Sequence, residues 1–237
     1  MDRLGDALAA NVRHIGFKDV GLPLDRLKEL ANAIKMAGAR LYLEVVSLDR
    51  ESERRSAEAA VELGVDVLMG GTRPEVVLPI IGDTRIRYYP FAGAIAGHPS
   101  VLVGTTETLV ESAKRLASIE GVHGLDLLAY RFGGNAPNLI REIVAAVEPK
   151  PVIVAGSIDR RDRIEAVVEE GAAGLTIGTA VLDGVFPAES EALVDQLHAV
   201  QGMIHGALRR PPKGRPLVES QFETGAGASE PKLVQAR

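Results

Sequence analysis

The sequence predicts an α/β fold, a (β/α)8 barrel that lacks its first strand at the N-terminal end. Short runs rich in β-branched residues alternate with amphipathic helices, and glycine follows several of the helices, a pattern typical of a parallel sheet covered by helices. The length of 237 residues suits one undivided barrel. In the two closing units glycine comes directly after a buried strand, which is typical of the anion-binding end of such barrels.

Composition limits the classes of function. The formal net charge of −5 argues against a general nucleic-acid or membrane-surface binder. The absence of cysteine excludes disulfides and thiolate chemistry and fits a reducing compartment. No apolar run approaches the roughly 18 residues of a membrane span, and the N-terminus has no apolar signal-peptide segment. We therefore expect a cytoplasmic protein without nucleic-acid or membrane partners.

The first half of the chain shows helices and strands in regular alternation. Leu27, Leu30 and Ile34 have the spacing of one apolar helix face, and Gly38 follows the end of that helix. Asn11 is expected to end the first helix in the left-handed conformation. The expected elements are a helix at 3–10, a strand at 12–17, a helix at 23–37, a strand at 41–46, a helix at 50–63, a strand at 65–69, a helix at 74–81 and a strand at 86–90.

The second half continues the alternation after a long loop at 93–104. The expected elements are a helix at 106–117, a strand at 122–129, a helix at 136–147, a strand at 151–155, a helix capped by Asp159 and ended by Gly171, a strand at 175–177, a short helical turn, and a helix at 188–204. The barrel domain then covers residues 1–208. We expect the polar segment 209–237 to be disordered, because it buries too little apolar surface to offset its ordering entropy.

The strand count differs from that of a complete barrel. The sequence predicts seven strands and opens on a helix, whereas a (β/α)8 barrel has eight strands and opens on a strand. Either the first strand lies upstream of Met1, or the barrel is open at that seam; a doubly wound sheet is the alternative architecture. Exposed strand edges at the seam would lower stability or promote association. The sequence therefore does not decide between a monomer and a homo-oligomer.

The two closing units predict a phosphate site. Gly156-Ser157 follows one buried strand, and Gly178-Thr179 follows the next. Each junction can present backbone N–H groups that have no partner within the chain, and such groups favour an anion. The alternative is two ordinary turns in which glycine serves packing alone.

These units also carry a resemblance to a known superfamily. The sequence VIVAGSI, followed one helix later by GLTIGTAV, resembles the closing βαβα unit of the phosphate-binding (ribulose-phosphate-binding) TIM barrels. That superfamily includes indole-glycerol-phosphate synthase, phosphoribosylanthranilate isomerase, the histidine-pathway isomerase and N-acylglucosamine-6-phosphate 2-epimerase. The motif covers about 35 residues. The resemblance implies a TIM barrel and a phosphorylated ligand, and it selects no reaction.

Candidate catalytic residues follow from the alternation of side chains along the strands. If Ile15 and Phe17 face the helices, Lys18 points into the barrel at its rim, and the same reasoning turns Glu44 inward on the adjacent strand. A lysine and a carboxylate in one poorly solvated barrel opening can exchange protons with a substrate, or they can form a structural ion pair. Asp126 points inward at a deeper level, either as a general base or as the partner of a core cation.

Three further residues are candidates for substrate contact. Arg131 follows a strand end and could reach a second anionic group, and Tyr130 points inward beside it. His98 lies in the long loop, where it is either a binding residue or a surface histidine. The sequence shows no metal-ligand spacing, no P-loop and no dinucleotide motif, so we expect a metal-independent protein without a cofactor.

The function expected from these residues is a sugar-phosphate isomerase or epimerase of carbohydrate metabolism that acts through an enediolate. One carboxylate would move the proton while Lys18 stabilises the oxyanion. One alternative is an aldolase or lyase in which Lys18 forms a Schiff base with a phosphorylated sugar acid. A second is a non-catalytic sensor of a phosphorylated ligand, and a third is a truncated barrel with no stable function.

Overall fold

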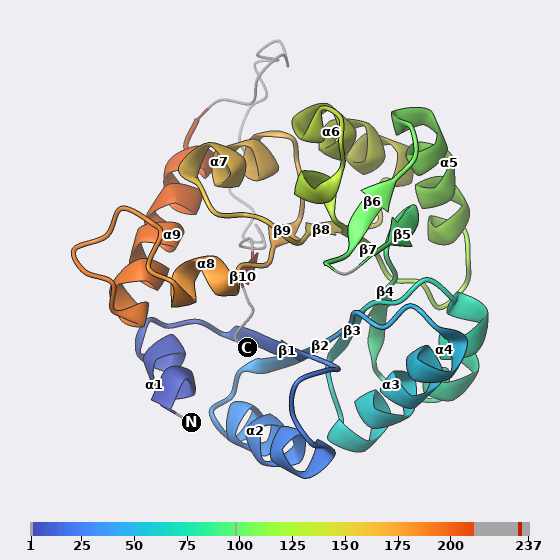
Figure 1. The fold of residues 1–237 in the computed structure, drawn as a ribbon, viewed down its shortest axis with the longest axis horizontal. Coiled ribbons are helices and arrows are strands. Elements are labelled where there is room, and N and C mark those ends of the chain that lie inside the picture. Colours follow the sequence, from blue (N-terminus) through green and yellow to red (C-terminus); the bar gives the residue numbers. More distant parts are fainter. Residues whose placement is uncertain (1, 98, 211–231, 234–237) are drawn as a thin grey trace, which may run out of the picture.

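The computed structural model describes residues 2–97, 99–210 and 232–233, and its helices surround an inner group of short strands (Figure 1). The strands that run through the middle are β1 (His14–Lys18), β2 (Arg40–Val45), β3 (Val67–Gly70), β4 (Arg87–Tyr89), β7 (Leu125–Leu127), β8 (Val152–Val154), β9 (Gly174–Leu175) and β10 (Lys232–Leu233). All seven predicted strands are present, although the observed ones are mostly shorter.

The helices follow the predicted order closely. They are α1 (Asp2–Ala9), α2 (Leu24–Met36), α3 (Arg50–Leu63), α4 (Pro74–Ile81), α5 (Thr106–Ala117), α6 (Ala136–Val147), α7 (Arg161–Glu169), α8 (Thr179–Leu182) and α9 (Leu193–Leu208). Asn11 and Gly64 have the left-handed φ values expected of residues that end helices, 59° and 61°. The expected cap of α7 is wrong: Arg160 holds the N-cap position, and Asp159 lies before it.

The strands form two parallel four-stranded sheets, ordered β1-β2-β3-β4 and β10-β9-β8-β7. Backbone bridges from Tyr88 to Val122 and from Phe91 to Asp126 join the first sheet to β7. On the other side β10 pairs with β9 and contacts β1, but no pairing joins β10 to β1 among the described residues. The structure therefore confirms a parallel α/β fold whose strands lie in one ring with a seam between β10 and β1.

The seam lies where the sequence predicts a missing strand. β10 comes from the segment expected to be disordered, and α1, which packs on α9, lies between α9 and α2 in the ring of helices (Figure 1). The structure differs from the expectation of disorder at two places. Lys232–Leu233 form a strand, and Arg210 pairs with Glu165 and Glu169. Residues 211–231 and 234–237 lie outside the described residues, so that expectation is untested there.

The core has an outer and an inner part, as the alternation of side chains predicts. Ile15 and Phe17 lie in the large cluster between strands and helices. Inside the strands, Val67, Met69 and Tyr89 form a small separate cluster with Tyr42 and Ile153 packed against it. The inward position of Tyr42 requires glycine opposite, because a Cβ on Gly16 would lie 2.7 Å from the Tyr42 Cβ.

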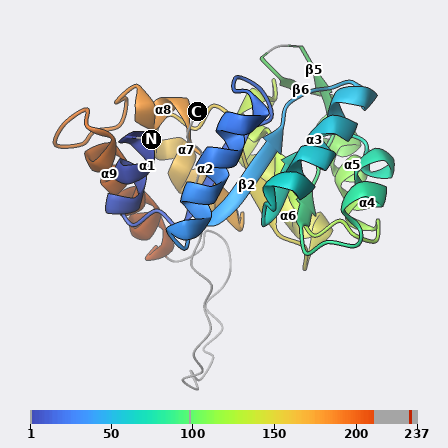
Figure 2. The ribbon, with the colours of Figure 1, turned by 90° about the horizontal axis from the view of Figure 1, so that it is seen from below.

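The loop expected at 93–104 contains an antiparallel hairpin, β5 (Ala94–Ala96) and β6 (Val101–Val103). Leu102 of this hairpin bridges to Phe132, just after the 3₁₀ turn η1 (Ala129–Arg131). Figure 2 shows the hairpin and α8 at the same end of the molecule. The two strands of the hairpin are mostly exposed and lack the buried apolar run that marked the predicted strands, so the hairpin was not predicted.

A buried carboxylate fixes the loop after β3. Glu53 of α3 is fully buried and accepts hydrogen bonds from the Thr72 amide, the Thr72 hydroxyl and the Arg73 amide. The Arg73 guanidinium also donates to Glu53 at 2.7 Å and to the Leu48 carbonyl at 2.7 Å. Because several donors share this one acceptor, its loss would leave them unsatisfied together.

We expect Glu53→Ala to lower the free energy of unfolding by about 3 kcal/mol or more, because it leaves buried donors and a partly buried guanidinium without their acceptor. Chemical denaturation measures this loss. Glu58→Ala on the exposed face of the same helix is the matched control, with an expected change below about 0.5 kcal/mol. Equal losses in the two variants would contradict the assigned role of Glu53.

Candidate functional site

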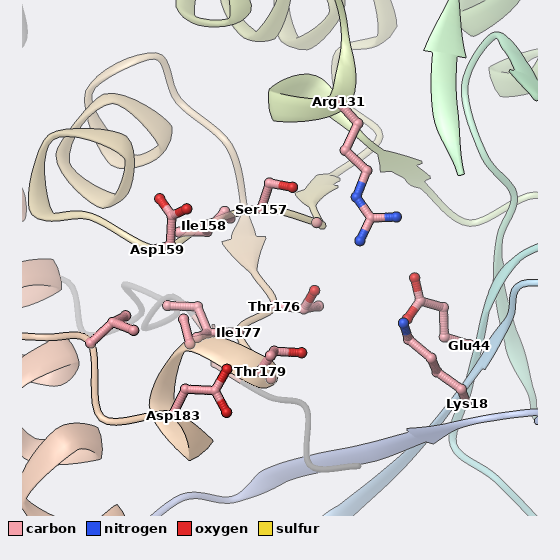
Figure 3. Close-up of a pocket in the computed structure, with 14 residues that line it drawn as sticks. Lys18, Glu44, Arg131, Ser157, Ile158, Asp159, Thr176, Ile177, Thr179 and Asp183 are labelled. Atoms are coloured by element: carbon pink, nitrogen blue, oxygen red, sulfur yellow. The ribbon is translucent and has the colours of Figure 1, made fainter. Parts of the chain in front are cut away.

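A cavity of about 370 Å³ opens at the carboxyl ends of the strands, within the volume range typical of small-molecule sites. The loops after β8 and β9 form one wall, Lys18 and Glu44 form the opposite wall, and Arg131 lies between them beside the loop after β8 (Figure 3). The first wall consists of 156–159, 176–180, Asp183 and Val185. The cavity therefore brings together seven of the ten predicted site residues: Lys18, Glu44, Arg131, Gly156, Ser157, Gly178 and Thr179.

Lys18 and Glu44 meet because β1 and β2 pair in register. Lys18 lies opposite Glu44 in the parallel ladder, and the Asp19 amide donates to the Glu44 carbonyl at 3.0 Å. Their side chains point toward each other at the cavity wall (Figure 3). Glu44 lines the cavity and is only 5% exposed, so its carboxylate is poorly solvated. The inward orientation predicted for both residues is confirmed by the cavity lining.

Asp126 lies deeper than the cavity and does not line it. The residue is fully buried, and neither carboxylate oxygen has a hydrogen-bond partner among the described residues. Burial raises the pKa of Asp126 well above its ordinary value, the charge of Glu44 raises it further, and Arg131 partly opposes the shift. The Asp126 carboxyl is therefore neutral at a pH where an exposed aspartate carries its charge.

The loops after β8 and β9 present backbone donors. The amides of Gly156, Ser157, Gly178 and Thr179 donate no hydrogen bond within the described part of the chain. Gly156 and Ser157 both have left-handed φ values, 76° and 56°. Consecutive amides in such a conformation form a concave donor surface that suits an anion.

Arg131 is held over this donor surface. A Cβ placed on Gly156 would lie 2.7 Å from the Arg131 Nε, so glycine lets the guanidinium approach the backbone. The Arg131 Nη1 also donates to the Ser100 carbonyl in the hairpin connection at 3.2 Å. Arg131 thus joins the hairpin to the cavity wall.

One predicted substrate contact is not found in the cavity. Tyr130 lies outside it, since its hydroxyl donates to the Arg163 carbonyl at 3.0 Å and its ring stacks under the Arg163 guanidinium. The 3₁₀ turn after β7 breaks the period-two alternation on which the inward prediction rested. His98 lies outside the described residues.

Three polar residues of this cavity were not predicted as site residues: Thr176, Asp183 and Asp159. Thr176 lies between Leu175 and Ile177, which pack in the outer core, so the alternation rule applied to this strand would have indicated it. Asp183 follows the short helix α8, and no local pattern marks it. Asp159 also lines the cavity and pairs with Arg163 at 3.0 Å.

Within residues 2–97, 99–210 and 232–233, no three His, Cys, Asp or Glu side chains lie close enough together to hold a metal ion. In the same ranges, every helix is too short or too polar to traverse a bilayer.

Comparisons with solved structures show the fold. Orotidine 5'-phosphate decarboxylase from Pyrococcus horikoshii OT3 superposes with a TM-score of 0.65 at 14% identity, covering 86% of this chain and 94% of that one. A mandelate oxidase mutant with an FMN adduct matches at a TM-score of 0.58 and 19% identity, covering 86% and 68%. The Amycolatopsis orientalis BexX/CysO complex matches at 0.57 and 20%, covering 93% and 87%. No family model and no curated protein matches the sequence.

The chain has an α/β fold with parallel sheets, and its structural neighbours are TIM-barrel enzymes. The likeness to orotidine 5'-phosphate decarboxylase and mandelate oxidase is consistent with the phosphate-binding TIM barrels that the closing motif resembles. At 14–20% identity these structures show the fold, and they confirm no family and no reaction.

We expect Asp126→Asn to make the protein more stable at neutral pH. The wild-type carboxyl is neutral when folded and ionises on unfolding, so stability falls as pH rises above its ordinary pKa of 3.8. The advantage of Asp126→Asn should grow from near pH 4 upward by at most about 1.4 kcal/mol per pH unit, and it should level off above the folded-state pKa.

Thermal and chemical unfolding from pH 4 to pH 9 measure this difference. The exposed Asp183→Asn on the same cavity is the control for changing an aspartate there. A stability difference between Asp126→Asn and the wild type that does not vary with pH would contradict a buried neutral carboxyl.

Proposed function

We propose that this chain is an enzyme that isomerises or epimerises a small phosphorylated substrate. The observation that carries the proposal is the cavity itself, in which unpartnered amides of two loops face a lysine, a buried glutamate and an arginine. Phosphate is the group that best matches several backbone donors at a barrel rim.

The charges of the cavity support a phosphate near Arg131 and Lys18. Arg131 lies beside the Gly156 amide and Lys18 lines the opposite side, so the two cations would complete the shell of donors around an anion. The carboxylate of Asp159 is paired with Arg163, which also donates to the Ser157 carbonyl. Asp183 is exposed on the cavity side away from Lys18 and Arg131 (Figure 3), where it would face hydroxyl groups.

With the phosphate on the amides, the neighbouring carbons of the substrate would lie over Lys18 and Glu44. Glu44 would remove the proton next to a carbonyl, and Lys18 would stabilise the oxygen charge of the enediolate. Return of the proton from Glu44 to the adjacent carbon, with transfer of the hydroxyl proton between the two enediolate oxygens, completes an isomerisation. In an epimerisation a water molecule would protonate the opposite face of the original carbon, and Glu44 would release its proton to solvent. Asp126 would act as a positioning residue, because its neutral carboxyl leaves Glu44 as the one negative charge at this point.

Two alternatives remain for the same cavity. Lys18 lines it and could form a Schiff base, as in an aldolase or lyase. A sensor would use the amides alone and would bind phosphorylated ligands without turnover. Both alternatives share the phosphate site and differ in the role of Lys18.

The first prediction is selective stabilisation by phosphorylated compounds. A ligand at about 100 times its Kd adds roughly 2.7 kcal/mol of stability, which raises the unfolding temperature measurably. A thermal-shift panel of sugar phosphates, inorganic phosphate and the matching unphosphorylated sugars tests this, with FMN and riboflavin as a further matched pair. No response from folded protein would contradict the phosphate site.

Two alanine variants localise the effect. Gly156 and Gly171 both have positive φ values, so Gly156→Ala and Gly171→Ala carry a similar backbone strain. Only Gly156 lies in the cavity, where an added Cβ would meet Arg131. We expect Gly156→Ala to weaken phosphate binding about 10-fold or more, and Gly171→Ala to leave it unchanged.

A second prediction separates the roles of Lys18. Lys18→Ala should lower kcat about 100-fold or more, because it removes the group that stabilises the oxyanion. Lys18→Arg keeps the charge but cannot form a Schiff base, so the enediolate route predicts that this variant retains part of the activity. Complete loss in Lys18→Arg, with a borohydride-trapped substrate adduct on wild-type Lys18, would favour the lyase instead.

A further inference from the structure

A second cavity adjoins the proposed phosphate site. It has a volume of about 500 Å³ and shares Lys18, Glu44 and Arg131 with the first cavity. These three residues therefore stand between two chambers. A ligand bound against these three residues would therefore border both chambers.

The second chamber is apolar apart from that shared wall. Its other lining residues, except Gly21 and Ser100, have apolar side chains: Phe17, Val20, Leu22, Leu27, Val46, Phe91, Pro99 and Leu128. Phe17 and Phe91 are buried parts of the core. Val20 and Leu22 are 50% and 48% exposed, so their apolar surface faces the open side of the chamber.

Hydrogen bonds hold both sides of this chamber in place. The loop after β1 is fixed by Asp19, which accepts from the Val46 amide at 3.0 Å, the Ser47 hydroxyl at 3.0 Å and the Ser56 hydroxyl at 2.7 Å. The opposite side is fixed by Arg131, which donates to the Ser100 carbonyl. The chamber is thus a built feature of the loops after β1, β2 and β4.

We propose that the substrate is a phosphate ester that carries an apolar group, such as an aromatic ring or a branched alkyl chain. The phosphate of such a ligand would lie on the donor loops, its reacting carbons would lie at Lys18 and Glu44, and its apolar group would lie in the apolar chamber. This inference rests on the proposed phosphate site. A sugar phosphate bearing only hydroxyl groups would leave Val20 and Leu22 exposed and the chamber without an apolar occupant.

The test uses n-alkyl phosphates from methyl to hexyl phosphate, with hexanol as the compound without phosphate. Each methylene that enters the chamber should strengthen binding up to about four-fold, the factor that corresponds to roughly 0.8 kcal/mol per buried CH₂. Isothermal titration calorimetry gives the Kd of each compound. We expect Kd to fall along the series, while hexanol binds weakly.

Leu22→Asn places an amide of similar size in the chamber and should flatten the dependence on chain length without changing the Kd of methyl phosphate. Leu208→Asn is the matched control, because Leu208 is also 48% exposed and ends α9 away from both chambers. The control should keep the wild-type dependence.

Each of the other outcomes would overturn a different part of the proposal. Phosphates that bind with a Kd independent of chain length would overturn the apolar substrate and leave the phosphate site standing. A dependence that persists in Leu22→Asn would place the alkyl chain elsewhere and overturn the role of this chamber. Failure of every phosphate to bind folded protein would overturn the proposed function and this inference with it.

Discussion

The structure depends on the alternation of side chains along the parallel strands. On β1 it sends Ile15 and Phe17 outward into the core beneath the helices and leaves Lys18 at the inner rim. The register of β1 on β2 then sets Lys18 opposite Glu44. A shift of one residue would turn the apolar residues inward and the charges into the core, so the same packing that stabilises the fold also fixes the positions of the charged groups.

The burial of Asp126 lowers the stability of the fold, and the packing of the surrounding core offsets this loss. Asp126 has no hydrogen-bond partner in the described residues, although buried polar groups normally have one. Leu125 and Leu127 on either side of it are fully buried in the outer core and hold β7 in place. A neutral carboxyl next to Glu44 is therefore maintained by apolar packing on the opposite face of the strand, and this is the kind of local compromise found at functional sites.

The parts of the molecule that were predicted correctly are those with a local signal. Glycine after a strand marked the loops at Gly156 and Gly178, and period-two alternation marked Lys18 and Glu44. Tyr130 was misplaced because a 3₁₀ turn after β7 interrupts the period-two alternation. The hairpin was missed because its strands are mostly exposed, and β10 was missed because it lies in a polar segment without a strand pattern.

The two walls of the site belong to different sheets. Lys18 and Glu44 stand on the sheet that starts with β1, whereas the donor amides follow β8 and β9 of the other sheet. No strand pairing joins β1 to the second sheet among the described residues. On this side the walls are held by α1 packed on α9, by the Gln201 side-chain amide, which donates to the Ala10 carbonyl at 2.8 Å, and by β10 between β9 and β1. On the other side the backbone bridges after β4 connect the first sheet to β7. The distance between the donor amides and the charged residues therefore depends both on these bridges and on helix packing at the seam, which lies outside the cavity.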